Sequence, residues 1–126
     1  MDMGKVLVEL LKKYNKRHRT RIQHEINHPK NSGYELIDVE TISINDLLGK
    51  HNIADVDLCS IDTEGGELEI LRAIDFSRFN IDILIIENNY YDLEIRNFMF
   101  SNGYHLMGSL SCDEIYKFNE WGDITL

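Results

Sequence analysis

The chain has 126 residues, of which 43% are hydrophobic and 28% are charged, and its 22 acidic and 13 basic residues give a net charge of −9. This length predicts one domain at most, because compact domains typically hold about 100 to 150 residues. The apolar content is too high for a disordered tail, so we expect a globular protein. No apolar run approaches the roughly 20 residues that cross a bilayer, and no secretory signal pattern opens the chain. We therefore predict a soluble, cytoplasmic protein that binds no membrane.

The two cysteines, Cys59 and Cys112, lie far apart in the sequence, each among strand-like residues. Their spacing matches neither a zinc site nor a disulfide-rich scaffold. Because free cysteine is among the most buried residue types, we predict reduced thiols in or near the core. The sequence predicts no structural metal site.

The first part of the chain is basic and the remainder is acidic. Residues 1–30 hold eight basic and three acidic residues, whereas residues 31–126 hold five basic and nineteen acidic ones. Apolar residues recur every three or four positions from Val6 to Ile26, which predicts an amphipathic helix. Its basic side could be a nucleic-acid patch, but the negative total charge repels phosphate, so we predict no nucleic-acid partner. We divide the chain into a basic helical segment, residues 1–29, and an α/β domain, residues 30–126.

The acidic part alternates predicted strands and helices. Strands are predicted at residues 34–41, 56–61, 81–87, 104–110 and 114–118, and helices at residues 43–48, 67–74 and 92–101. The unbroken apolar run from Ile83 to Ile86 is typical of a central parallel strand with helices on both faces. The last two strands are predicted to form an antiparallel hairpin. The expected fold is α/β, with a mostly parallel sheet.

Acidic residues gather where two of these strands end. Asp62 and Glu64 follow the strand at residues 56–61, and Glu87 ends the next strand. Because open α/β sheets place ligands at the carboxyl ends of their strands, we expect these three acids to face one crevice. Such acids can bind Mg²⁺, polarise a ligand hydroxyl, or act as a general base when burial and like charge raise one pKa. The adjacent Gly65 and Gly66 allow a tight turn or a close approach to a ligand.

The neighbouring residues have a second interpretation. For Glu67 and Glu69 the favoured interpretation is structural: their negative charge complements the positive end of the helix that they begin. For Asp62 and Glu64 a functional role is favoured, because a buried acid is a costly way to build a turn. The segment Asn88 to Tyr91 either lines the crevice or caps the following helix, and the sequence leaves both open.

The residues from Asp57 to Leu71 resemble the D-x-L-x-I-D-x-E-G-x-E-x-x-x-L signature of FkbM-type methyltransferases. The segment from Thr41 to Leu48 resembles that family's T-L-D-x-L segment, and the strand ending in Glu87 resembles its next strand. Gly103 and Tyr104 resemble the Gly-Tyr pair at its last passage from helix to strand. The resemblance covers roughly residues 34–118.

The resemblance implies a class I, Rossmann-like fold that transfers a methyl group from S-adenosylmethionine, often to a hydroxyl oxygen of a sugar, lipid or natural product. A small molecule or a glycan is then the expected acceptor. Asp62, Glu64 and Glu87 would be the catalytic residues. Gly65 and Gly66 would shape the turn beside the cofactor, with Gly66 standing where the family usually has a small alanine.

The sequence also departs from the family. It has no counterpart of the glycine-rich loop after the family's first strand, nor of the acid that ends its second strand. We therefore expect the carboxyl-terminal half of such a domain, inactive alone, with an exposed sheet edge that pairs with a partner chain or a second copy. Two alternatives remain: a non-catalytic, partner-binding remnant of this fold, and a Mg²⁺-dependent hydrolase that uses the same acids.

Overall fold

The computed structural model describes residues 16–30 and 33–119, and the chain divides into two compact units, residues 1–41 and 42–126. In the first unit, helix α2 spans Lys16–Ile26, so the described part of the predicted amphipathic helix is helical and residues 6–15 of it lie outside the described residues. The strand predicted at residues 34–41 is wrong. These residues pair with no strand in the described part of the chain, and strand structure requires a partner for the backbone hydrogen bonds.

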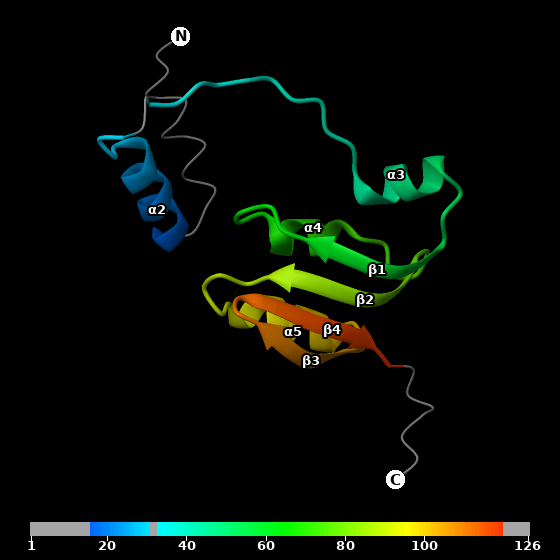
Figure 1. Cartoon of the computed structure of the whole chain (residues 1–126). Coiled ribbons are helices and arrows are strands. Elements are labelled where there is room, and N and C mark those ends of the chain that lie inside the picture. Colours follow the sequence, from blue (N-terminus) through cyan, green and yellow to red (C-terminus); the bar gives the residue numbers. More distant parts are fainter. Residues whose placement is uncertain (1–15, 31–32, 120–126) are drawn as a thin grey trace. The chain divides into compact units, whose positions relative to one another are not determined.

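The second unit contains one sheet and the remaining described helices (Figure 1). In chain order they are α3 (Ile44–Lys50), β1 (Asp55–Ile61), α4 (Glu67–Ala73), β2 (Asn80–Glu87), α5 (Leu93–Ser101), β3 (Tyr104–Leu110) and β4 (Asp113–Phe118). The strand order is β1-β2-β4-β3. These elements match the predicted strands and helices, and the α/β class is confirmed.

The sheet is mixed, so the expectation of a mostly parallel sheet is wrong for the described residues. Strands β1 and β2 are parallel, whereas β4 runs antiparallel to both β2 and β3. The cause is the C-terminal hairpin, which was predicted. Its second strand folds back between β2 and β3 and reverses the direction of pairing at that position.

Strands β1 and β2 are joined through α4 as a β-α-β unit, the usual connection between parallel neighbours. Their register pairs Val56 with Ile81 at one end and Ile61 with Ile86 at the other. Both strands therefore end together, and the residues that follow these last partners, Asp62 and Glu87, lie side by side at one edge.

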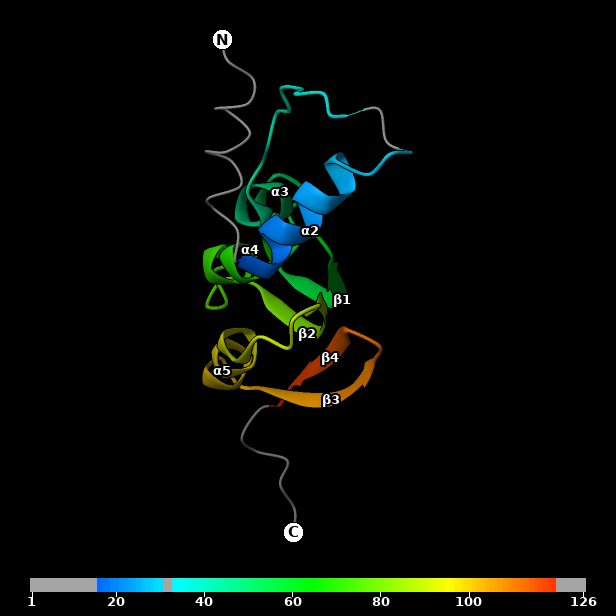
Figure 2. The same cartoon turned by 90° about the vertical axis from the view of Figure 1, so that its left-hand side faces the viewer.

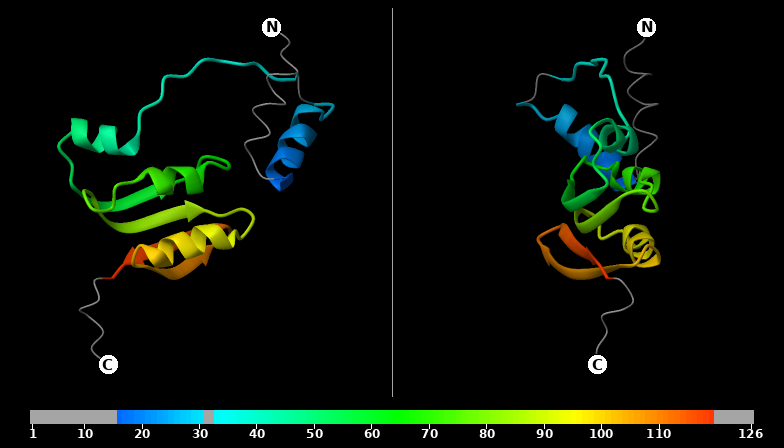
Figure 3. Two further views of the ribbon diagram at one scale, coloured as in Figure 1. Left: turned by 180° about the vertical axis from the view of Figure 1, so that it is seen from behind. Right: turned by 90° about the vertical axis from the view of Figure 1, so that its right-hand side faces the viewer.

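Helices α4 and α5 cover the same face of the sheet (Figures 2 and 3). Leu84 and Tyr116 from the sheet and Leu71 and Met99 from the helices are fully buried between them. The opposite face is less covered in the described residues, where Ile83 and Ile85 are half-buried and Leu58 is 55% exposed. Among the described residues of this unit, helices cover one face only, so the expected helices on both faces of β2 are not found there.

Local signals fix the helix ends. The hydroxyl of Ser43 accepts a hydrogen bond from the backbone of Asp46 at 3.0 Å, which caps the first turn of α3. Gly103 follows α5 with a φ of 84°, the left-handed conformation common after a helix end. Leu93, the first residue of α5, is 65% exposed.

The two cysteines are free and partly buried, as predicted. Burial raises the pKa of the Cys59 thiol. None of the helices in the described residues is long and apolar enough to cross a bilayer.

Candidate functional site

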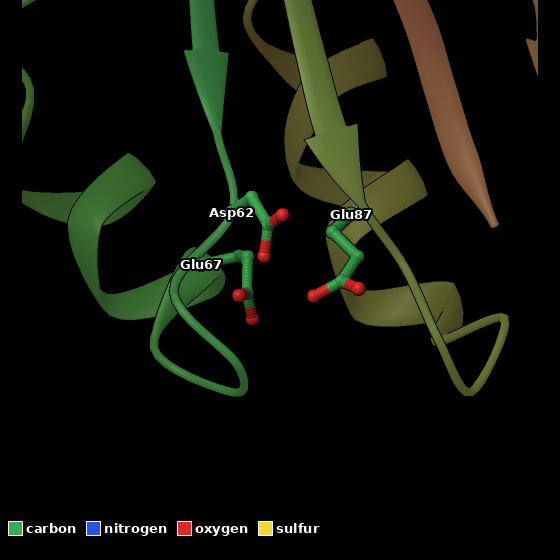
Figure 4. A group of neighbouring side chains, drawn as sticks. All are labelled: Asp62, Glu67 and Glu87. Carbon is green, nitrogen blue, oxygen red and sulfur yellow. The ribbon is translucent and has the colours of Figure 1, made fainter.

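The side chains of Asp62, Glu67 and Glu87 converge where β1 and β2 end (Figure 4). One carboxylate oxygen from each residue lies within 4.8 Å of one from each of the other two. The structure therefore brings together two of the predicted acids, Asp62 and Glu87, and adds Glu67, for which a role at the helix end is predicted. Three acidic oxygens at this separation can coordinate one cation between them.

The turn between β1 and α4 is held by Glu67. Its Oε1 atom accepts hydrogen bonds from the backbone N–H of Thr63 at 2.8 Å, the Thr63 hydroxyl at 3.0 Å and the backbone N–H of Gly65 at 3.0 Å. Glu67 is only 6% exposed. Burial is the largest influence on its pKa and raises it, but these hydrogen bonds outweigh burial and the pKa is lowered. Glu67 is therefore an ionised acid committed to the turn.

The glycines have a conformational role in this turn. Gly65 has a φ of 122°, a conformation that side chains rarely adopt, and Gly66 is the N-cap residue of α4. A Cβ atom on Gly66 would lie 3.2 Å from the Thr63 hydroxyl, so an alanine there requires a small shift. Glu64 also has a left-handed φ, 58°, which directs the turn. Contact of these glycines with a cofactor stays a prediction.

Asp62 and Glu64 are more exposed than the sequence predicts. Asp62 and Glu64 are exposed, so the argument that a buried acid needs a functional reason does not apply to them. That argument applies instead to Glu67, and in part to Glu87, which is half-buried. The signal for Glu67 was weak in the sequence, because its bonds depend on the left-handed turn and not on the usual capping-box spacing.

Glu87 is the electrostatically perturbed member of the group. Burial is the largest cause and raises its pKa, a hydrogen bond from Asn89 opposes this, and the carboxylates of Asp62 and Glu64 raise it further. Its Oε2 atom is buried and has no hydrogen-bond partner among the described residues. Glu87 therefore holds its proton to a higher pH than an ordinary glutamate does.

This raised pKa predicts a pH-dependent gain in stability when Glu87 is replaced by glutamine. A carboxyl whose folded-state pKa exceeds its unfolded value binds more protons when folded, so its contribution to stability is lost as pH rises through the folded pKa. Relative to the parent chain, Glu87→Gln should become more stable as the pH rises. Urea denaturation between about pH 4 and pH 8 measures this difference.

The exposed Glu69, also in the first turn of α4, provides the control. The variant Glu69→Gln should show no such growth in relative stability with pH. A Glu87→Gln difference that is constant, or that shrinks as pH rises, would contradict the assignment of the perturbed group.

Asn88 resolves an alternative that the sequence left open. It is 2% exposed, its Oδ1 atom accepts a hydrogen bond from the backbone of Asp92 at 2.7 Å, and its Nδ2 atom donates to Glu114 at 3.1 Å. Asn88 therefore supports the start of α5 and does not line the acidic edge. Tyr91, in contrast, is 60% exposed.

Comparison with family models finds the family that the sequence motifs resemble. The Methyltransferase FkbM domain matches residues 6–106, well over half of the chain. The chain belongs to the FkbM methyltransferase domain family, which confirms the resemblance seen in the sequence. The match begins nearer the N-terminus than the expected region, residues 34–118. Comparisons with curated proteins and with solved structures gave no match.

Proposed function

We propose that this chain acts in S-adenosylmethionine-dependent methyl transfer to a hydroxyl oxygen, at the edge formed by Asp62 and Glu87. The observation that carries the proposal is the convergence of their carboxylates after two adjacent parallel strands, in a chain of a methyltransferase family. Ligands of open α/β sheets bind outside the carboxyl ends of the strands. The β1-α4-β2 unit supports interpreting the sheet as part of a Rossmann-like fold, and the acceptor as a small molecule or glycan.

The residues at this edge fit the cofactor in charge and in hydrogen bonding. S-adenosylmethionine carries a positive sulfonium and an ammonium group, and its ribose hydroxyls donate hydrogen bonds. The exposed carboxylates of Asp62 and Glu64 complement these groups, whereas Glu67 is already occupied by the turn. Gly65 and Gly66 leave the backbone of the turn open to close approach. When bound, the cofactor supplies an electrophilic methyl group.

Glu87 is the proposed general base. A hydroxyl must lose its proton as its oxygen forms the new bond to the methyl carbon, and a base works best when its pKa approaches the operating pH. Burial and the neighbouring acids move the Glu87 pKa upward in this direction. Its unpartnered Oε2 atom is available to accept that proton. Asp62 and Glu64 maintain the negative potential that keeps Glu87 basic.

Calorimetric titration of the 126-residue chain with S-adenosylmethionine tests this proposal. Binding does not require turnover, so we expect the parent chain to bind the cofactor even though the chain is expected to be inactive alone. The affinity should be about tenfold lower in Asp62→Asn, because one charge-assisted hydrogen bond is lost. Glu69→Gln, which removes one negative charge from the exposed start of α4, should bind as the parent does. Circular dichroism establishes that each variant is folded.

Two outcomes would contradict the proposal. Equal affinity of the parent and Asp62→Asn would show that Asp62 does not contact the cofactor. A folded parent chain that does not bind S-adenosylmethionine would show that this chain does not use the cofactor. Heat released on titration with Mg²⁺ alone, without a response to the cofactor, would favour a Mg²⁺-dependent hydrolase instead.

A second candidate function, binding a partner chain, is favoured by the position of β1. In the described part of the chain no strand pairs with the outer edge of β1, and Leu58 on that strand is 55% exposed. Edge strands of this kind pair readily with other chains. Sedimentation of the parent chain over a range of concentrations distinguishes self-association from a monomer that requires a different partner.

A further inference from the structure

A cavity lies at the opposite end of the sheet, where β1 and β2 begin. Its volume is about 520 Å³. Small-molecule sites typically measure about 300 to 1,000 Å³, so the cavity is large enough for an organic ligand. Its lining includes the aromatic residues Phe76, Tyr104 and Phe118 and the acids Asp57 and Asp82, together with Asp55, which accepts a hydrogen bond from Asn80. It is separate from the acidic edge at Asp62, which lies beyond the other end of the same strands.

The aromatic wall of the cavity is built from rings that pack on one another. The ring centres of Phe76 and Tyr104 are 5.6 Å apart, and those of Tyr104 and Phe118 are 5.3 Å apart, with interplanar angles near 60°. The hydroxyl of Tyr104 donates a hydrogen bond to the carbonyl oxygen of Ile81 at 2.7 Å, which fixes the central ring. The wall is therefore preformed.

Two acids stand beside this wall without a counter-ion. The register pairs Val56 with Ile81 and Leu58 with Ile83, so Asp57 and Asp82 are direct neighbours on adjacent strands. Like charges in this position are destabilising. Among the described residues neither carboxylate takes part in a hydrogen bond or ion pair, and the cavity lining contains no basic side chain.

We propose that this cavity binds a small organic cation with an apolar body. The positive group would lie between the carboxylates of Asp57 and Asp82 and relieve their mutual repulsion. The apolar body would contact the rings of Phe76, Tyr104 and Phe118, whose faces also attract cations. The proposal is independent of methyl transfer, because it uses other residues at the other end of the strands.

Nuclear magnetic resonance titration of the ¹⁵N-labelled chain with phenethylammonium tests this site. Phenethyl alcohol and phenylacetate serve as neutral and anionic probes of the same size. We expect shifts at residues 55–57, 80–82 and 102–104, a dissociation constant for the cation about tenfold lower than for the alcohol, and no binding of phenylacetate. Equal affinity for the cation and the alcohol would overturn the proposal, because the cavity would then be only an apolar site.

Variants that replace each aspartate by asparagine test which carboxylates bind the cation. Asp57→Asn and Asp82→Asn should each raise the dissociation constant for the cation about threefold or more and leave that for the alcohol unchanged. Both variants remove a like-charge contact, so we expect them to fold. Asp38→Asn, an equal charge change at an exposed residue of the other unit, is the control. An equal loss of affinity in all three variants would mean that net charge alone attracts the cation and would refute the site.

Discussion

Replacing Arg96 by alanine should lower the free energy of unfolding by more than the loss of an exposed ion pair does, because the substitution leaves a buried carboxylate without its cation. That carboxylate belongs to Glu114 on β4, which is 1% exposed. Its Oε1 atom accepts hydrogen bonds from Nε of Arg96 at 2.8 Å and from Nη2 at 2.5 Å. The ion pair therefore ties α5 to the central part of the sheet.

The second oxygen of Glu114 is also occupied. It accepts hydrogen bonds from the Tyr116 hydroxyl at 2.5 Å and from Nδ2 of Asn88 at 3.1 Å. Burial is the largest influence on the Glu114 pKa and raises it, but the bonds from Arg96, Tyr116 and Asn88 together lower it. Because the folded pKa lies below the unfolded one, this group's stabilisation is present above the unfolded pKa and is lost as pH falls through the folded pKa.

Urea denaturation measures both effects. The stability difference between the parent and Glu114→Gln should be largest near neutral pH and should shrink on acidification. Arg72→Ala is the matched control, because Arg72 pairs with Glu94 on α5 in an exposed ion pair, and it should cost less than about 1 kcal/mol. Equal, small losses for Arg96→Ala and Arg72→Ala would show that the Glu114 cluster does not stabilise the fold.

Replacing Glu67 by alanine should cost about 3 kcal/mol, because hydrogen bonds to a buried charged group are strong and their loss leaves backbone donors unpaired. The donors at stake are the backbone N–H groups of Thr63 and Gly65. Loss of the hydrogen bonds accepted by Glu67 should also disorder the turn that carries Glu64. Urea denaturation gives the free energy, and amide hydrogen exchange at residues 63–66 reports the turn.

The variant Glu69→Ala distinguishes the effect of the Glu67 hydrogen bonds from the effect of negative charge at the start of α4. Both acids lie in the first turn of α4, but Glu69 is exposed, so its removal should cost only about 0.3 to 1 kcal/mol. Equal costs for the two substitutions would restore the interpretation that the sequence alone favoured for Glu67. Glu67→Gln, which keeps one acceptor oxygen, should recover part of the loss.

The order of helices and strands after residue 42 could be predicted because each element carries its own pattern. The apolar run of β2, the spacing along α4 and the capping Ser43 are local signals, and the structure follows them. The strand expected at residues 34–41 had β-forming residues but no partner strand, and a partner is not encoded locally. The mixed sheet likewise depends on where the C-terminal hairpin docks, which is a long-range property.

In the candidate site, too, some features could be predicted from the sequence and others could not. The meeting of Asp62 and Glu87 could be predicted, because parallel neighbours of equal register end at the same edge. The role of Glu67 could not, since it depends on the left-handed conformation of Glu64 and Gly65. The burial of Glu114 was also hidden, because it requires Arg96, 18 residues earlier in the sequence.

The most direct test of the proposed function is to locate the cofactor product on the chain. Titration of the ¹⁵N-labelled protein with S-adenosylhomocysteine should shift the amide signals of residues 62–67 and 87–89, at the edge where β1 and β2 end. Asp62→Asn should weaken this response. Shifts confined to residues 55–57 and 80–82, or no shifts in the folded parent chain, would contradict the placement of methyl transfer at this edge.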